Sequence, residues 1–202
     1  MDGNIVVNAW KSIDKHMFTL VLGANMQDNK EDNKSFSATG FLSDKLTNLD
    51  FAMQYREGAK PRGSVSQDRL IGFFANASYA YDNRYLFDFS YRTDGSSKFG
   101  KNNKWGYFPA FSAAWRLGEE EFIKNLNIFS DLKVRLGYGM AGNNRIDSYL
   151  SLAVLGSVTY PNGDSTQPGY VSKQIPNPDL KWEANKTFNF GLDFGFFNQR
   201  LT

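Results

Sequence analysis

The sequence contains no cysteine and a single histidine, His16. Without cysteine there are no disulfides and no thiolate metal ligands, and one histidine is too few for a zinc centre built from imidazoles. A Ser-His-Asp set would have to use the same histidine, and the G-x-S-x-G turn that exposes a nucleophilic serine does not occur. We therefore predict no catalytic, metal-binding or cofactor-binding residues, and we expect a protein that is not an enzyme.

A strong charge of either sign is also lacking. The 23 basic and 21 acidic residues of the 202-residue chain give a net charge of +2, and no basic run is present. This balance argues against a nucleic-acid partner. The first ten residues, "MDGNIVVNAW", lack the basic and apolar regions of a signal peptide, so we expect no secretory signal in this piece.

Long apolar runs are missing too, because no stretch approaches the roughly 18 residues of a transmembrane helix. The mean hydropathy is −0.48. Neither measure detects membrane strands, in which apolar and polar residues alternate and average out.

Aromatic residues are abundant, with 18 Phe and 10 Tyr, and they alternate with polar residues. In "RYLFDFSYR" (84–92) every second residue is aromatic, which is typical of a β-strand with one apolar and one wet face. The same alternation predicts seven strands, at about Asn4–Lys11, His16–Gln27, Arg69–Tyr81, 84–92, Gly106–Leu117, Leu132–Met140 and Ala184–Phe197. After the turn "FNQR" an eighth strand would begin at Leu201–Thr202.

The connections between these strands run short, long, short, long, medium, long and short. The three long ones are 28–68, 93–105 and 141–183, and the medium one contains a short helical turn that begins at the acidic Glu119–Glu121. In an up-and-down antiparallel sheet alternate connections lie at opposite edges, so all three long loops share one edge. Outer-membrane barrels show this asymmetry, and a strand of about ten residues tilted by about 40° spans their apolar band of about 25 Å.

Tyrosine and tryptophan, which favour membrane interfaces, lie near both ends of the strands. The short-turn edge has Trp10, Tyr79, Tyr81, Tyr85 and Trp115, and the long-loop edge has Tyr91, Trp105, Tyr107 and Tyr138. We therefore expect an all-β fold, an antiparallel up-and-down segment of a transmembrane β-barrel. Its apolar face would contact lipid and its polar face a watery interior, with the lumen-facing candidates Asp88, Arg92, Arg116, Arg135 and Asp193. A soluble β-sandwich, whose apolar faces pack on a second sheet, is the alternative.

The stretches 84–125, 132–144 and 175–201 resemble the SusC/RagA family, the TonB-dependent outer-membrane transporters of Bacteroidetes bacteria. Two motifs within them are highly specific, "DGSSKFGKNNKWGYFPA" (94–110) and "NPDLKWE" (177–183), and the resemblance of "KLTNLDFA" (45–52) is weaker. The first does not have the spacing of a phosphate-binding P-loop and precedes no helix, so we expect it to be a hairpin loop at the barrel mouth.

The resemblance implies that residues 1–202 form about a third of the wall of a barrel of roughly 22 strands in the outer membrane of a Gram-negative cell. The family's signal peptide, TonB-binding segment and plug domain have no counterpart in this sequence. It further implies import of large nutrients, glycans or oligopeptides, with energy from TonB and a SusD-like lipoprotein as a lid. A surface barrel with a structural or adhesive role and no transport is the alternative.

The last long loop offers aromatic rings that could contact a ligand or the lid. These are Tyr149, Tyr160, Tyr170 and Trp182. Such rings stack on sugar faces, but they can equally pack the loop against itself. The sequence leaves both roles open.

Overall fold

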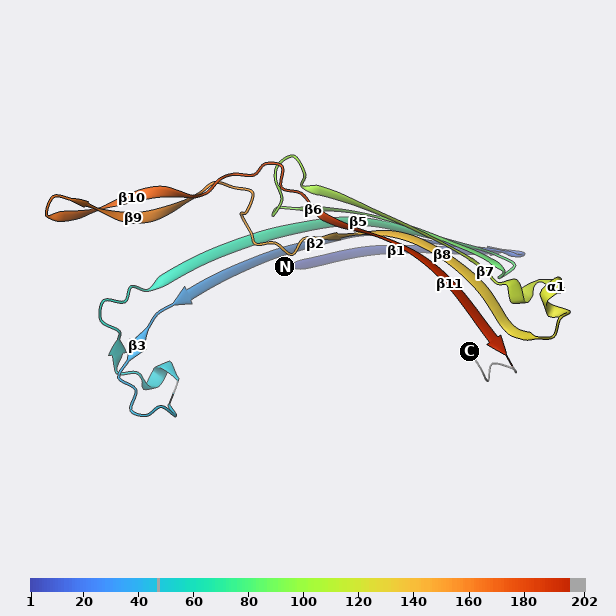
Figure 1. Cartoon of the computed structure of the whole chain (residues 1–202), viewed down its shortest axis with the longest axis horizontal. Helices are drawn as coiled ribbons and strands as arrows, with labels where there is room; N and C mark the ends of the chain where they lie inside the picture. The colour runs from blue at the N-terminus through green and yellow to red at the C-terminus, as the bar shows by residue number, and fades with distance from the viewer. Residues whose placement is uncertain (47, 197–202) are drawn as a thin grey trace.

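The computed structural model describes residues 1–46 and 48–196 of the chain (Figure 1). The expected end of the seventh strand at Phe197, the turn that follows and the eighth strand at Leu201–Thr202 lie outside the described residues.

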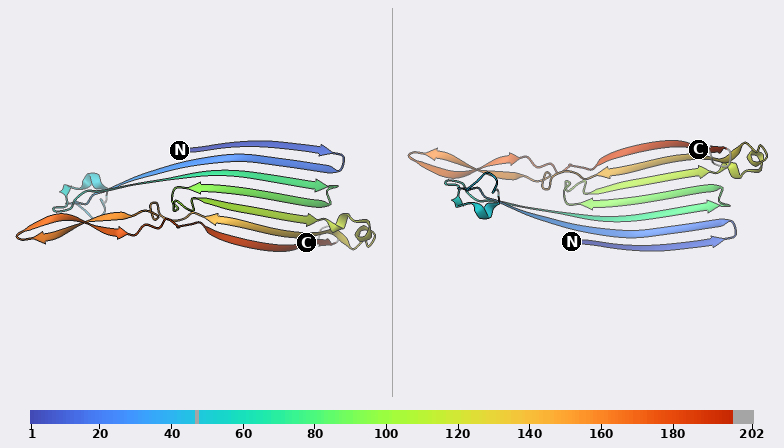
Figure 2. Two further views of the ribbon diagram at one scale, coloured as in Figure 1. Left: turned by 90° about the horizontal axis from the view of Figure 1, so that it is seen from above. Right: turned by 90° about the horizontal axis from the view of Figure 1, so that it is seen from below.

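Most of the chain forms one antiparallel sheet of seven strands, in the order β1-β2-β5-β6-β7-β8-β11. Each strand pairs with its neighbours along the chain apart from the excursions that carry β3, β4, β9 and β10, so the sheet is an up-and-down meander (Figure 2). The expected all-β fold with seven antiparallel strands is confirmed. Its strands are β1 (Asp2–Ile13), β2 (His16–Ser35), β5 (Arg62–Tyr81), β6 (Tyr85–Ser96), β7 (Trp105–Trp115), β8 (Phe129–Asn143) and β11 (Glu183–Phe196).

Strands β2 and β5 are longer than the alternation predicted. They pair without interruption from His16↔Tyr81 to Ser35↔Arg62, whereas we expected β2 to end at Gln27 and β5 to begin at Arg69. The added halves are polar on both sides, so no alternation marks them. Twenty strand residues rise about 66 Å, far more than an apolar band of about 25 Å, and the pair extends well beyond the other strands at the long-loop edge (Figure 1).

The long polar stretches also contain secondary structure that we did not predict. Residues 36–61 hold β3 (Ala38–Thr39), the 3₁₀ turn η1 (Leu49–Phe51) and β4 (Gln54–Tyr55), and β3 pairs with β4. Within 144–182, β9 (Val154–Asn162) and β10 (Ser165–Gln174) form a separate hairpin. Figures 1 and 2 show this hairpin projecting beyond the long-loop edge of the sheet.

The medium connection contains the expected helical turn. A 3₁₀ turn, η2 (Leu117–Glu119), precedes the short helix α1 (Glu121–Lys124), and acidic residues occupy the first turn of each. Strand β7 ends at Trp115, two residues earlier than expected.

The seven-stranded sheet is a single layer with almost no hydrophobic core. Among the described residues only two hydrophobic side chains are buried, Phe99 and Phe108, whereas large apolar side chains along the sheet stay exposed. A β-sandwich would bury one face of each sheet against the other. The described residues therefore do not form a sandwich by themselves. No helix in the described part of the chain is long and apolar enough to cross a membrane.

Candidate functional site

The two faces of the sheet differ in chemistry along its whole width. Because directly paired residues point to the same face, the register defines rows that cross all seven strands. One row is Trp10, Thr19, Ser78, Asp88, Ser112, Gly137 and Asn189, and the next row, on the opposite face, is Ala9, Leu20, Ala77, Phe89, Phe111, Tyr138 and Phe188. Apart from Trp10, the first row is polar or glycine, and the second is apolar or aromatic.

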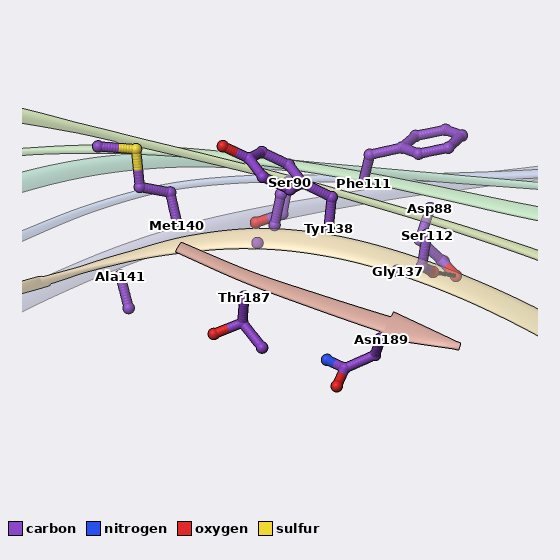
Figure 3. Close-up of a pocket in the computed structure, with 12 residues that line it drawn as sticks. Asp88, Ser90, Phe111, Ser112, Gly137, Tyr138, Met140, Ala141, Thr187 and Asn189 are labelled. Atoms are coloured by element: carbon purple, nitrogen blue, oxygen red, sulfur yellow. Dashed lines mark hydrogen bonds between the residues drawn. The ribbon is translucent and has the colours of Figure 1, made fainter. Parts of the chain in front are cut away.

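The polar face is the concave one. In Figure 3, Phe111, Tyr138 and Met140 stand on the convex side of the bowed strand β8, and Ala141, Thr187 and Asn189 lie on its concave side. Phe188 and Phe190 on the apolar face are 70% and 66% exposed. A barrel wall in a membrane has this arrangement, with lipid against the convex surface and water inside.

Two of the predicted lumen-facing residues, Arg135 and Asp193, form a bidentate ion pair between β8 and β11. The Arg135 guanidinium donates to both carboxylate oxygens of Asp193, at 2.7 Å and 2.6 Å. Gly191 lies beneath the guanidinium, and a Cβ there would approach it to 3.2 Å. The pair fixes a charge of each sign on the concave face.

A third predicted residue, Asp88, lies at the centre of the concave face, where it accepts a hydrogen bond from the Ser112 hydroxyl at 3.1 Å. It lines a shallow hollow of about 380 Å³ whose wall also includes Ser90, Gly137 and Asn189 (Figure 3). Polar groups on a floor of small residues suit a surface that water or a hydrophilic solute contacts.

Arg92 is held in a network toward the long-loop edge. Its guanidinium donates to both oxygens of Asp94, each at 2.7 Å, and to the Asn25 side-chain oxygen at 3.0 Å. These three side chains meet above Gly72, where a Cβ would lie 2.3–2.7 Å from them. The network links β2 to β6 across β5, and Asp94 is buried beneath it.

Arg116, the remaining lumen-facing candidate, lies outside the strands. It follows the last residue of β7 and precedes η2, and its backbone N–H donates to the Arg84 carbonyl at 2.8 Å. The structure thus groups Asp88, Arg92, Arg135 and Asp193 on the concave face and places Arg116 at the short-turn edge.

The aromatic residues at the short-turn edge form a row of neighbouring rings. His16 lies 4.9 Å from Tyr81, Tyr81 lies 6.3 Å from Tyr85, and Tyr85 lies 6.0 Å from Trp115, measured between centroids. Trp10 lies at this edge too, but its register places it on the polar face. At the opposite edge, Trp105 stacks beside Phe73 at 6.3 Å.

Glu120 ties the short-turn connection to this aromatic row, a role that the sequence did not reveal. Its carboxylate accepts hydrogen bonds from the Tyr85 hydroxyl at 2.7 Å and the Trp115 indole at 3.1 Å, and Arg84 lies 3.4 Å away. These hydrogen bonds, with the nearby guanidinium, lower the pKa of Glu120 below its ordinary value. We had expected a solvated helix start, which describes Glu119 and its ion pair with Lys124.

The two specific sequence motifs pack against each other at the long-loop edge. Trp182 lies 4.6 Å from Phe99 and 5.4 Å from Phe108, and its indole N–H donates to the Lys104 carbonyl at 3.0 Å. Gly100 donates its N–H to the Leu180 carbonyl at 2.9 Å. We call this contact between 97–104 and 176–182 the mouth clasp. It contains Phe99, which is 2% exposed.

The four loop aromatics have different surroundings. Trp182 belongs to the mouth clasp, and Tyr149 fixes its loop to β5 by accepting a hydrogen bond from the Gln67 N–H at 2.8 Å. Tyr160 and Tyr170 lie on opposite faces of the β9–β10 hairpin, 50% and 76% exposed. Contact of these rings with a ligand or a lid stays a prediction.

The wall of a transmembrane barrel is the class of structure that this sheet defines. Residues 9–202 match the family described as "TonB dependent receptor-like, beta-barrel", and the chain belongs to that family. Its members are receptors of the Gram-negative outer membrane rather than enzymes, as the resemblance to SusC and RagA implied.

Several known proteins are similar to the chain over almost its whole length. It is 38% identical to the TonB-dependent receptor SusC of Bacteroides thetaiotaomicron over 98% of its residues, and 33% identical to the TonB-dependent receptor P3 of Formosa agariphila over 95%. The structure of the RagAB peptide transporter matches 98% of the chain with a TM-score of 0.82 and 32% identity. The chain spans about a fifth of these proteins, 20% of SusC, 19% of P3 and 22% of the transporter chain.

Proposed function

We propose that this chain forms part of the wall of a TonB-dependent importer of large nutrients, glycans or oligopeptides. The observation that carries the proposal is the row of polar residues and glycine on the concave face of six strands, β2 to β11 in the order of the sheet, backed by an apolar row on the convex face of all seven. Such a wall encloses a hydrophilic path through lipid. The similarity to SusC and to the RagAB peptide transporter supports import as the use of that path.

The remaining parts of the importer lie, in this proposal, elsewhere in a longer protein of which residues 1–202 are one segment. A signal peptide, a TonB-binding segment and a plug domain would precede a barrel of about 22 strands. A SusD-like lipoprotein would cover the extracellular mouth, where the long loops, the mouth clasp and the β9–β10 hairpin gather. TonB would supply the energy that displaces the plug.

The test is uptake by cells that carry the complete receptor gene. We expect a deletion strain to lose growth on at least one member of a panel of glycans and peptide mixtures, and expect the gene to restore it. Uptake of that nutrient, labelled with a fluorophore, should stop when TonB is deleted. A receptor that reaches the cell surface while growth and uptake stay unchanged on the whole panel would contradict import and favour a structural barrel.

A further inference from the structure

A hollow of about 440 Å³ lies at the long-loop edge, beside the part of β5 that precedes Leu70 and no longer pairs with β6. Loop 97–104 forms one side, the loop before β9 another, and Gln67 of β5 a third. The residues that the argument below uses are Lys98, Lys101, Lys104, Ser148, Tyr149 and Ser151, all of which line the hollow. None of these belongs to the polar rows of the concave face.

Positive charge dominates this hollow. Three lysines line it and no carboxylate does. Two carboxylates lie near its walls. The Asp68 carboxylate is 4.0 Å from the Lys98 ammonium, and the Asp179 carboxylate accepts a hydrogen bond from Asn102 of loop 97–104 at 2.8 Å. Across residues 1–46 and 48–196, neither Lys101 nor Lys104 has an ion-pair partner. A hollow whose charged lining residues are all lysines attracts an anion.

The walls of the hollow are held in place before any ligand arrives. On one side the mouth clasp fixes loop 97–104 through Phe99 and the bond from Trp182 to Lys104. On the other side Tyr149 has a φ of 69°, a conformation that bulky residues rarely adopt. Its hydroxyl accepts the Gln67 N–H and its carbonyl accepts the Gln174 amide, which together hold it there. A preformed site loses less conformational entropy when it binds.

Hydroxyl groups complement the lysines. Ser148 and Ser151 line the same hollow, and Ser151 is 8% exposed. The Tyr149 oxygen accepts the Gln67 N–H, which leaves its own hydrogen to donate. Ammonium and hydroxyl donors around one space match the several acceptor oxygens of a carboxylate, sulfate or phosphate.

We propose that this hollow is a binding site for an oxyanion, a phosphate or a carboxylate group of a ligand. In this site the lysine side chains attract the anion. A P-loop would instead use backbone N–H groups and the helix that follows it, so the absence of a helix after loop 97–104 does not argue against the site. The oxyanion can belong to a soluble ligand or to the phosphorylated headgroup of an outer-leaflet lipid. The inference does not depend on import, because a barrel without transport would hold the same site.

The experiment uses the complete receptor, purified in detergent and stripped of bound lipid. The probes are glucose 1-phosphate, glucuronate and, as the neutral control, glucose, measured by isothermal titration calorimetry. We expect the two anions to bind, glucose not to bind, and the affinity to fall as salt screens the charges. The K98Q/K101Q/K104Q variant should bind the anions at least tenfold more weakly.

The matched control is K30Q/K45Q/K60Q, which removes the same charge from exposed lysines outside the hollow. It should leave the affinity unchanged, and K101Q alone should weaken binding about threefold if the triple variant does not fold. Equal loss in the hollow and control variants, or binding of glucose as tight as that of the anions, would overturn the proposal.

A second measurement separates the two sources of the anion. Lipid that copurifies with the receptor is quantified by mass spectrometry before stripping. If the headgroup is the natural ligand, K98Q/K101Q/K104Q loses phosphorylated lipid that wild type and control retain. Equal lipid in all three proteins, together with weaker soluble-anion binding in the hollow variant alone, assigns the site to a soluble anion. The proposal fails if the hollow variant changes neither quantity. Nutrient uptake is measured separately, so loss of anion binding is distinguishable from loss of import.

Discussion

Strands β2 and β5 form one hydrogen-bonded ladder with two different sequence patterns. The lower half pairs 16–27 with 70–81, and the upper half, toward the long-loop edge, pairs 28–35 with 62–69. From His16↔Tyr81 to Gln27↔Leu70 one face carries apolar or aromatic residues at nearly every position. From Asp28↔Arg69 to Ser35↔Arg62 both faces are polar, apart from Val65. The pairing continues unbroken through the change. Alternation therefore reports what each face touches, lipid or water, and not where a strand begins or ends.

The two halves cannot be told apart by exposure in the chain alone. Phe89 belongs to the neighbouring strand β6, in the same row as Leu20 of β2 and Ala77 of β5, and is 50% exposed. Val65, in the upper half of β5, is 55% exposed. Their surroundings in the membrane should differ completely, because only the lower side chain would meet hydrocarbon. This difference can be tested by substitution.

The largest effect should come from a charge on the lower apolar face. Phe89→Arg in the complete receptor should destabilise the folded barrel by about 2–4 kcal/mol, the cost of arginine on the lipid face near the bilayer midplane. Val65→Arg, the control in the upper half, should stay within about 0.5 kcal/mol of wild type. Urea unfolding from lipid vesicles measures both. Equal losses in the two variants would show that the halves share one environment.

The next effect concerns the mouth clasp, where the loops 97–104 and 176–182 pack against each other at the long-loop edge. In Gly100→Ala the new Cβ would lie 2.0 Å from the Pro178 carbonyl oxygen, so the loops must separate. Overpacking of this kind costs about 1–3 kcal/mol. Gly137→Ala, on the lower concave face, meets nothing within 4 Å and is the matched control. Limited proteolysis should cut loop 97–104 faster in Gly100→Ala only. If both variants resist protease equally, the clasp does not hold the loop.

Spin labels sharpen the same comparison without a large energetic effect. The chain has no cysteine, so single cysteines give unique labels. Labels at Phe87 and Phe190 should be accessible to oxygen dissolved in lipid, and labels at Asp88 and Asp193 to a water-soluble nickel complex. In the upper half of β2, the neighbours Asp32 and Asn33 should both report water. Aqueous surroundings at Phe87 and Phe190 would remove the basis for the barrel wall.

The smallest effect concerns Glu120, in the connection between β7 and β8 at the short-turn edge of the sheet. Its pKa is lowered in the folded state, chiefly by the hydrogen bonds from Tyr85 and Trp115. The contribution of Glu120 to the stability of the folded protein is therefore complete above the ordinary pKa of a glutamate. It is lost as the pH falls through the lowered pKa of Glu120 in the folded state. Glu120→Gln should unfold at a lower temperature than wild type at neutral pH, and the difference should shrink in acid.

Glu121→Gln is the control for this experiment, because it removes the same charge one residue away. The Glu121 side chain has no hydrogen-bond or ion-pair partner within the described part of the chain. A difference between wild type and Glu120→Gln that persists unchanged in acid would mean that the carboxylate charge is not what holds the connection.

Much of the lower part of the sheet could be predicted from the alternation of apolar and polar residues along the sequence. The alternation in 84–92 and its neighbours predicted seven strands and their antiparallel order, which the structure confirms. These features are local, because a strand that separates lipid from water must change polarity at every residue. The upper half of β2 and the β9–β10 hairpin were missed for the same reason, since strands with water on both sides carry no such signal. That Asp88, Arg135 and Asp193 face a watery lumen stays a prediction.

Other features of the site depend on residues far apart in the sequence. Phe99 and Trp182 are identifiable as parts of two motifs, but nothing in either motif says that the two meet. Glu120 looks like any acidic helix start until its carboxylate is seen against Tyr85 and Trp115. The hollow of three lysines likewise requires the loop before β9 to close against loop 97–104.

The sequence by itself determined that this protein is all-β with one apolar face, since apolar side chains recur on every second residue. The long loops at one edge and the resemblance to SusC and RagA favoured a barrel over the sandwich that the alternation left open. Only the tertiary structure decided which face is concave, how far β2 and β5 extend beyond the other strands, and which loops join at the mouth. The physical reason is range. Lipid on one face and water on the other impose alternating polarity on successive residues. The curvature of the sheet, the mouth clasp and the hollow come instead from contacts between segments far apart in the chain, and such contacts leave no periodic pattern in the sequence.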